Sequence, residues 1–117
     1  MTTRSIISAK FGDQIVSTYL HNGGEEQVNN LLLDFYQTED EVKELLGEGD
    51  LSSLAETPEA CDAYHKRGEA WENIKPVITK HLNGLRPKLD RGLGSHFHFD
   101  GAAWTYNGRP LKRTYGG

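Results

Sequence analysis

Two histidines alternate with two phenylalanines in His96-Phe97-His98-Phe99, and Asp100 follows directly. The alternation predicts a strand over 95–99, in which His96 and His98 point to the same side. Asp100 joins them if the strand continues, and His21 comes near if its own strand lies in the same sheet. Two imidazoles and a carboxylate can bind a transition metal or transfer protons. The alternative is structural, with the phenylalanines facing the core and the histidines on the wet face of a half-exposed strand.

A glycine-rich basic segment over 83–94 carries Arg86, Lys88 and Arg91. Guanidinium groups can hold phosphate or carboxylate with two hydrogen bonds, and glycines such as Gly92 and Gly94 let the backbone approach an anion. The sequence has neither a GxxxxGK[ST] nor a GxGxxG phosphate-binding pattern. This segment therefore predicts an anion site that matches neither of these patterns. The alternative is a solvated connecting loop.

The run His21-Asn22-Gly23-Gly24 follows a predicted strand and precedes a predicted helix. Backbone amides at a helix start can receive an anion, which makes His21 a second ligand-binding candidate. A tight turn that requires glycine is the alternative. Arg4 and Arg109 add positive charge from the two ends of the chain and complete the anion-binding candidates.

Cys61 is the only cysteine of the sequence. One thiol excludes an internal disulfide and any zinc site with two or more cysteine ligands. Cys61 shares a predicted helical face with Ala60 and Tyr64, so we interpret it as a small core residue rather than a nucleophile. We expect no bound cofactor.

The elements that must position these residues are two hairpins with helices between them. Residues that favour β structure predict strands over 3–11 and 14–21, joined by the turn Gly12-Asp13. Asp100-Gly101 and Asn107-Gly108 predict a second hairpin or meander after residue 95, with a last short strand over 111–115.

The middle of the chain predicts helices. A helical stripe over 25–36 is formed by Val28, Leu31, Leu32 and Phe35. Thr38 and Glu41 have capping-box spacing before a short helix that Gly47 and Gly49 end, and Leu51 and Leu54 then predict an irregular loop on the core. Thr57-Pro58 opens a weak helix over 58–67. A further helix over 69–82 is lined by Trp71, Ile74 and Ile78 and is kinked or restarted at Pro76.

Strands segregated from helices predict one α+β domain, 1–117, in which an antiparallel sheet from the N-terminal and C-terminal hairpins packs against three to four helices. Hydrophobic content of 36% and charged content of 26% suit a folded domain with one core. No apolar run approaches the roughly 18 residues of a membrane span, and the N-terminus does not have the pattern of a signal peptide. We therefore expect no membrane contact and a cytoplasmic location.

The net charge of −4 is unevenly distributed. Residues 1–83 carry 15 acidic and 7 basic side chains, whereas residues 84–117 carry 2 acidic and 6 basic side chains. The overall acidity argues against broad nucleic-acid binding, because attraction to phosphate requires positive surface. The basic end leaves a small anion site open, and the alternative is that the two ends neutralise each other in the fold.

The N-terminal half resembles a group of small phage and prophage accessory proteins. Those proteins begin with a motif close to Thr-Arg-Ser-Thr-Ile, which reads Thr3-Arg4-Ser5-Ile6-Ile7 here. Their later motifs, a Tyr-x-His before a glycine turn, a Leu-Leu helix leading to a tyrosine, and Gly-Asp-x-Ser-Ser-Leu, match residues 19–24, 32–36 and 49–54. The resemblance covers about residues 3–54. Of the group's Tyr-Gly-Arg-Asp-Arg-Gly stretch, only Asp90-Arg91-Gly92 is present.

The resemblance implies an accessory protein that acts by binding in the host cytoplasm. The predicted function is non-enzymatic: binding a host protein, as a counter-defence protein does, or sequestering a phosphorylated nucleotide ligand. A symmetric homo-oligomer that traps an anion between protomers is compatible with this prediction. The alternative is a small metal-dependent or acid–base enzyme centred on His96, His98, Asp100 and His21. A structural component of a virion is a third interpretation.

Overall fold

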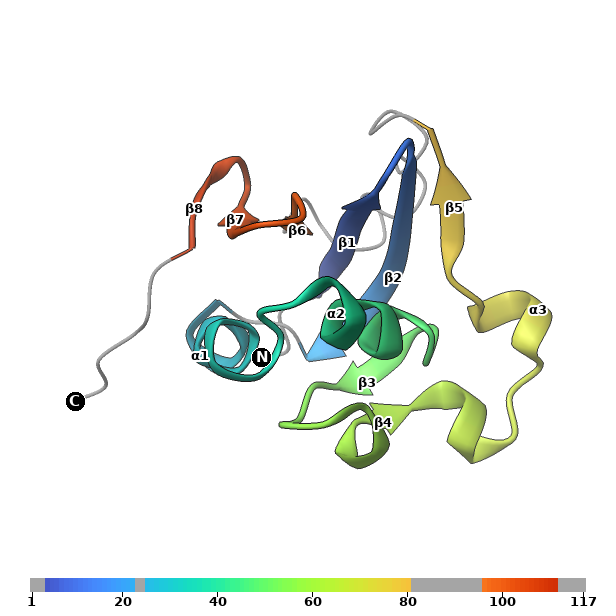
Figure 1. Cartoon of the computed structure of the whole chain (residues 1–117). Coiled ribbons are helices and arrows are strands. Elements are labelled where there is room, and N and C mark those ends of the chain that lie inside the picture. The colour runs from blue at the N-terminus through green and yellow to red at the C-terminus, as the bar shows by residue number, and fades with distance from the viewer. Residues whose placement is uncertain (1–3, 23–24, 81–95, 112–117) are drawn as a thin grey trace.

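The computed structural model describes residues 4–22, 25–80 and 96–111 (Figure 1). Its strands are β1 (Ser5–Phe11), β2 (Gln14–Asn22), β3 (Leu51–Ser53), β4 (Asp62–Ala63), β5 (Val77–Thr79), β6 (His96–Phe99), β7 (Trp104–Tyr106) and β8 (Arg109–Pro110). Its helices are α1 (Glu25–Phe35), α2 (Glu39–Leu46) and α3 (Trp71–Ile74), with the 3-10 turns η1 (Pro58–Ala60) and η2 (Tyr64–Arg67). None of the helices in this part of the chain has both the length and the apolar character needed to cross a bilayer.

The strands form one mixed sheet. Its order is β4-β3-β2-β1-β6-β7-β8, and β5 pairs with β2 outside this path. β1 pairs antiparallel with β2 and parallel with β6, and β2 pairs parallel with β3. The predicted antiparallel sheet packed against three to four helices is therefore wrong. Within the described residues, eight strands stand beside three helices, of which only α1 and α2 reach seven residues. Alternation and turn residues identify a strand, but they do not encode the direction of its partner.

Residues 57–79 form short turns and strands where the sequence predicts two helices. Thr57 caps η1, and the chain then continues as β4 and η2. α3 ends at Ile74, and Pro76 is followed by β5 rather than by a second helical segment. Proline cannot donate the N–H that a continued helix needs, and Val77-Ile78-Thr79 are all β-branched.

The predicted N-terminal hairpin is confirmed, with pairs from Ser5–Leu20 to Phe11–Gln14. The other edge of β2 is shared between two strands, because β5 pairs with Ile15–Ser17 and β3 pairs with Leu20 and Asn22. In the gap between them, the backbone N–H of Tyr19 donates to Oδ1 of the buried Asp50 at 2.9 Å. The carboxylate of Asp50 thus supplies the acceptor that a strand would supply elsewhere.

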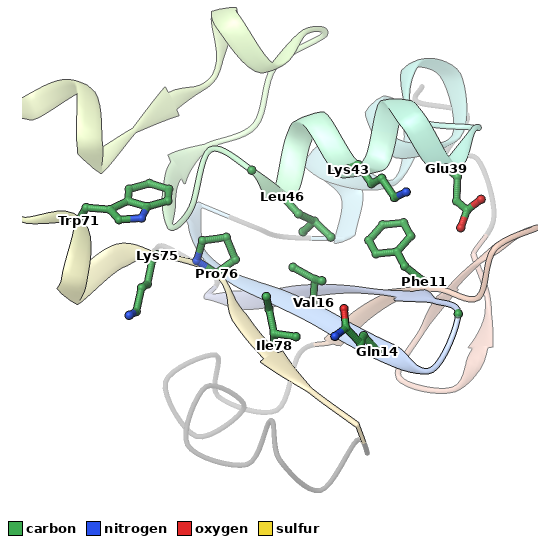
Figure 2. A pocket seen from close by; sticks show the side chains of 12 residues that line it. Phe11, Gln14, Val16, Glu39, Lys43, Leu46, Trp71, Lys75, Pro76 and Ile78 are labelled. Carbon is green, nitrogen blue, oxygen red and sulfur yellow. The ribbon is translucent and has the colours of Figure 1, made fainter.

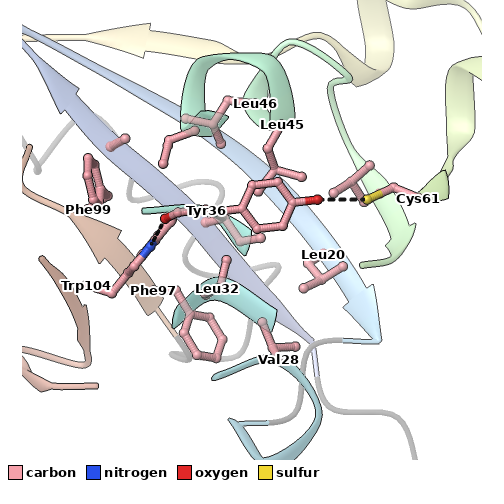
Figure 3. Close-up of a cluster of buried hydrophobic side chains, with 14 of the residues drawn as sticks. Leu20, Val28, Leu32, Tyr36, Leu45, Leu46, Cys61, Phe97, Phe99 and Trp104 are labelled. Carbon is pink, nitrogen blue, oxygen red and sulfur yellow. Dashed lines mark hydrogen bonds between the residues drawn. The ribbon is translucent and has the colours of Figure 1, made fainter. Parts of the chain in front are cut away.

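The helices α1 and α2 cover one face of the sheet, and the main core lies between them and the central strands (Figures 1 and 3). α2 begins as predicted, with a capping box formed by Thr38 and Glu41. Its buried residues Val42, Leu45 and Leu46 belong to the same core cluster as residues from β1, β2, β6 and β7, which include Ile7, Ala9, Leu20, Phe97, Phe99 and Trp104.

The buried stripe of α1 differs from the predicted stripe at its end. Val28 and Leu32 are buried as expected, but Phe35 is 39% exposed and Tyr36 is buried in its place. The Tyr36 hydroxyl donates to the carbonyl of Ala55 at 2.8 Å. The carbonyl of Tyr36 accepts from Nε1 of Trp104 at 2.7 Å (Figure 3). These bonds hold Tyr36 in the core through partners that lie far away in the sequence.

Candidate functional site

The predicted strand over 95–99 is confirmed as β6, and its histidines lie on the sheet face opposite α1 and α2. Phe97 and Phe99 are buried in the main core, while His96 and His98 are half-buried and pair in register with Ile6 and Ser8 of β1. The two imidazole ring centroids are 5.7 Å apart. The alternation therefore placed both histidines on one face, as a strand period of two requires.

The nearest polar group to both histidines is the Ser8 hydroxyl. Its Oγ lies 2.6 Å from His96 Nε2 and 2.7 Å from His98 Nδ1. A hydroxyl has one hydrogen, so it donates to one of these nitrogens and accepts the N–H of the other. Ser8 is fully buried, and this keeps its oxygen away from any substrate. The serine and two histidines therefore form a hydrogen-bonded layer that joins β1 to β6.

Burial keeps this layer uncharged. The pKa of His96 is lowered to about 4, mainly by burial and to a smaller extent by the neighbouring His98. The pKa of His98 is also lowered, first by burial and then by Lys10, while Asp100 acts in the opposite direction. Both imidazoles are neutral at pH 7, because each pKa lies below its ordinary value of about 6.5.

Asp100 and His21 do not join the two histidines. β6 ends at Phe99, and Oδ1 of Asp100 accepts from the backbone N–H groups of Ala102 and Ala103, both at 2.8 Å. His21 Nδ1 lies 2.9 Å from the Tyr19 hydroxyl. Among the residues that the structure describes, no group of three histidine, cysteine, aspartate or glutamate side chains is placed to hold a metal ion.

Of the predicted anion-binding residues that the structure describes, Arg4 and His21 are neighbours in the hairpin, because Arg4 precedes Ser5 and His21 follows Leu20, the partner of Ser5. Arg109 lies apart from both. Arg4 lies just before β1, whereas Arg109 begins β8, with β6 and β7 between these strands in the sheet. Both arginines are exposed. The remaining candidates of the basic segment and the glycine turn lie outside the described residues, namely Arg86, Lys88, Arg91, Gly92, Gly94, Gly23 and Gly24.

Cys61 is a core residue, as predicted. It is 2% exposed, and its sulfur accepts the backbone N–H of Ala55 at 3.2 Å. Burial raises the pKa of its thiol. A protonated, buried thiol is not a nucleophile at neutral pH.

The described surface carries a pocket that the sequence did not predict (Figure 2). It has a volume of about 640 Å³ and lies between α2, the β1–β2 hairpin and the segment from α3 to β5. Its apolar lining is Phe11, Val16, Leu46, Trp71, Pro76 and Ile78. Trp71 is 44% exposed and Ile78 is 61% exposed, which makes them two of the three large apolar side chains that the described residues leave exposed.

Trp71 is held in the pocket wall by close packing. Gly49 has φ of +77°, and a Cβ atom at this position would lie 2.5 Å from the Ile74 carbonyl oxygen and 3.0 Å from the Trp71 ring. The next residue, Asp50, donates its N–H to the same carbonyl at 2.7 Å. The imidazole of His65 meets the indole edge-on, with ring centroids 6.0 Å apart. The end of α2 and the turn η2 thus position Trp71.

Two ammonium groups and one carboxylate border the apolar lining. Lys43 Nζ lies 5.3 Å from the centroid of the Phe11 ring. Lys75 Nζ donates to Oε2 of Glu72 at 3.0 Å. The carboxylate belongs to Glu39, in the first turn of α2.

The sequence does not predict the pocket, because its pattern places Trp71, Ile74 and Ile78 in line on one helix over 69–82. Only Ile74 of the three is buried. Pro76 is the one local signal that a strand, rather than a helix, follows α3. In a strand, Ile78 points to a different surface from the one it would occupy in a continued helix.

Comparisons with protein-family models, with curated proteins and with solved structures find no match for this chain. The fold and the pocket define a small mixed-sheet domain with an open, largely apolar pocket. The resemblance of residues 3–54 to phage accessory proteins stays a prediction.

Proposed function

We propose that this chain is a non-enzymatic binding protein and that the pocket receives apolar side chains of a partner protein. The observation that carries the proposal is the exposure of Trp71 and Ile78 at one pocket of about 640 Å³. Exposed apolar side chains that gather at one place usually mark an interaction site, and tryptophan is enriched among the residues that dominate binding energy.

The fixed position of Trp71 supports this proposal. Gly49 and His65 pack against the indole, so it loses little conformational freedom when a partner covers it. A rigid aromatic side chain beside an open pocket is a suitable anchor. Burial of its surface favours binding, and little conformational entropy is lost because the side chain is already ordered.

The biological setting comes from the N-terminal resemblance. A phage accessory protein acts in the cytoplasm of its host, so the partner we propose is a host protein, such as a component of a defence system. Sequestration of a phosphorylated nucleotide stays a prediction, since three of its basic candidates lie outside the described residues. The alternative of an enzyme still relies on His96 and His98. Both imidazoles are, however, hydrogen-bonded to the hydroxyl of the buried Ser8.

The test is native mass spectrometry of tagged protein purified from bacterial host lysate without added ligands. Wild type is compared with the double variant Trp71→Ala/Ile78→Ala and with the control Phe35→Ala. Phe35 is the third exposed large apolar residue, and it lies outside this pocket. Circular dichroism checks that all three proteins are folded.

We expect one stoichiometric protein partner that wild type and the Phe35 variant retain and the double variant loses. Equal retention by the double variant would place the binding site elsewhere. A wild-type protein that carries only a metal ion would instead favour the enzyme centred on His96 and His98.

A further inference from the structure

We infer that the partner segment carries acidic side chains on both sides of its apolar anchor. This inference rests on the proposed function and adds the chemistry that selects the partner. It is based on where the pocket places its charges relative to its apolar lining.

The two lysines lie toward opposite ends of the apolar surface (Figure 2). Lys43 projects from α2 beside Phe11, and Lys75 follows α3 beside Trp71 and Pro76. An apolar side chain that enters between them has one ammonium group toward each end. A segment with a carboxylate on either side of its anchor can therefore reach both lysines while the anchor is buried.

Both ammonium groups can accept a new partner. Lys43 forms no ion pair within the described residues, and its printed neighbour is the face of the Phe11 ring. Lys75 pairs with Glu72, three residues earlier, but both side chains are largely exposed, at 51% and 81%. An exposed pair of this kind is weak and exchanges readily, so a partner carboxylate that is partly shielded by the pocket competes well.

The acidic groups near the pocket restrict how an acidic partner segment can be oriented, and they do not cancel its attraction to Lys43 and Lys75. Glu39 lies one helical turn before Lys43, in the first turn of α2 together with Asp40 and Glu41. The rest of the chain is also acidic overall, with a net charge of −4. An acidic segment is therefore disfavoured beside these carboxylates and attracted at the two lysines, which favours one docking position over others.

The test begins with a random peptide library displayed on phage and selected on immobilised wild-type protein, with counter-selection on Trp71→Ala. Selected peptides are then synthesised and titrated by indole fluorescence. Trp71 is the responsive fluorophore, because the only other tryptophan, Trp104, is 4% exposed. The test variant is Lys43→Glu/Lys75→Glu. The matched control is Lys10→Glu/Lys80→Glu, which changes the net charge equally at exposed lysines outside the pocket.

We expect selected peptides with a large apolar residue and with Asp or Glu on both sides of it. Their Kd should rise about tenfold in the Lys43/Lys75 variant and less than twofold in the Lys10/Lys80 variant, as expected for two exposed ion pairs turned into repulsions. The neutral variant Lys43→Gln/Lys75→Gln should fall between wild type and the charge reversal. Raised salt should weaken binding to wild type but not to the charge-reversed protein.

Two outcomes distinguish a failure of this inference from a failure of the proposed protein-binding function. Peptides that depend on Trp71 but lack acidic residues, or that bind the charge-reversed variant as well as wild type, would overturn the acidic partner and leave the pocket in place. A selection that yields no peptide dependent on Trp71 would overturn the proposed protein-binding function itself.

Discussion

The Ser8 hydroxyl lies between the imidazole nitrogens of His96 and His98, and its single hydrogen limits how many protons the group can hold. With both rings neutral, Ser8 donates once and accepts once. If both rings are protonated, each nitrogen is a donor, and the Ser8 hydrogen loses its acceptor. Protonation also brings charge to a largely buried place. The cluster is therefore stable in its neutral form.

This gives a pH prediction. The folded pKa of His96, about 4, lies below the ordinary value of 6.5, so the unfolded chain binds more protons between these two values. The free energy of unfolding should therefore fall as pH is lowered from 6.5 to about 4, with His96 contributing roughly 2–4 kcal/mol of the loss. Urea denaturation at several pH values measures this fall in the free energy of unfolding.

The variant His96→Asn should unfold with a shallower dependence on pH over the same window. Equal slopes for wild type and the His96 variant would contradict the prediction, whatever the absolute stability of that variant.

At the scale of elements, the contact between the end of α2 and α3 depends on one glycine. Gly49 and Gly68 both have positive φ, but only Gly49 has backbone and side-chain atoms where a Cβ atom would lie. We expect Gly68→Ala to destabilise the fold by about 1–2 kcal/mol, which is the cost of the left-handed conformation alone. For Gly49→Ala we expect about 2–5 kcal/mol, because overpacking adds to that cost.

Thermal or urea denaturation of the two glycine variants gives the comparison directly. Gly49→Ala should also change the fluorescence of Trp71, because the methyl group meets the indole ring. Equal losses of stability in both variants would show that the close approach of Gly49 to α3 does not matter.

Helix α1 supplies a second test at this scale, because Phe35 belongs to the predicted stripe but is 39% exposed in the structure. Leu32 is fully buried, so Leu32→Ala should cost about 2–5 kcal/mol. Phe35→Ala should cost less than about 1 kcal/mol, since much of that side chain is already in water. Urea denaturation of both variants checks this, and a large loss for Phe35→Ala would favour the stripe predicted from sequence.

At the scale of the whole molecule, the sheet joins the two ends of the chain. β1 pairs with β6 although the two strands are far apart in the sequence, and the Ser8–His96 hydrogen bond joins residues separated by 88 positions. β6 and β7 also supply Phe97, Phe99 and Trp104 to the main core. The N-terminal hairpin and the helices therefore lack part of their core without the C-terminal strands.

We predict that a chain ending at residue 95 does not fold cooperatively. It would expose one edge of β1 and remove three large buried side chains from the core. Near-ultraviolet circular dichroism and urea denaturation should show no native signal and no sharp transition. A transition with the wild-type midpoint would show instead that β1 to β5 form an independent unit.

Local signals in the sequence determined several elements of this protein. The turn at Gly12-Asp13 and its flanking β-favouring residues predicted the first hairpin, and the capping box at Thr38 and Glu41 predicted the start of α2. The alternation over 96–99 predicted a strand with two histidines on one face. These features depend on residues within a few positions of one another, so a short stretch of sequence contains them.

Only the tertiary structure decided which partners these elements meet. The parallel pairing of β1 with β6 brings Ser8 to the histidines, Trp104 of β7 helps to hold Tyr36 in place of Phe35, and the strand after Pro76 exposes Ile78. Each outcome is set by contacts between segments far apart in the chain, where burial and packing outweigh local preference. For the same reason, the sequence pointed to histidines and basic residues, whereas the pocket around Trp71 is visible only once the fold is assembled.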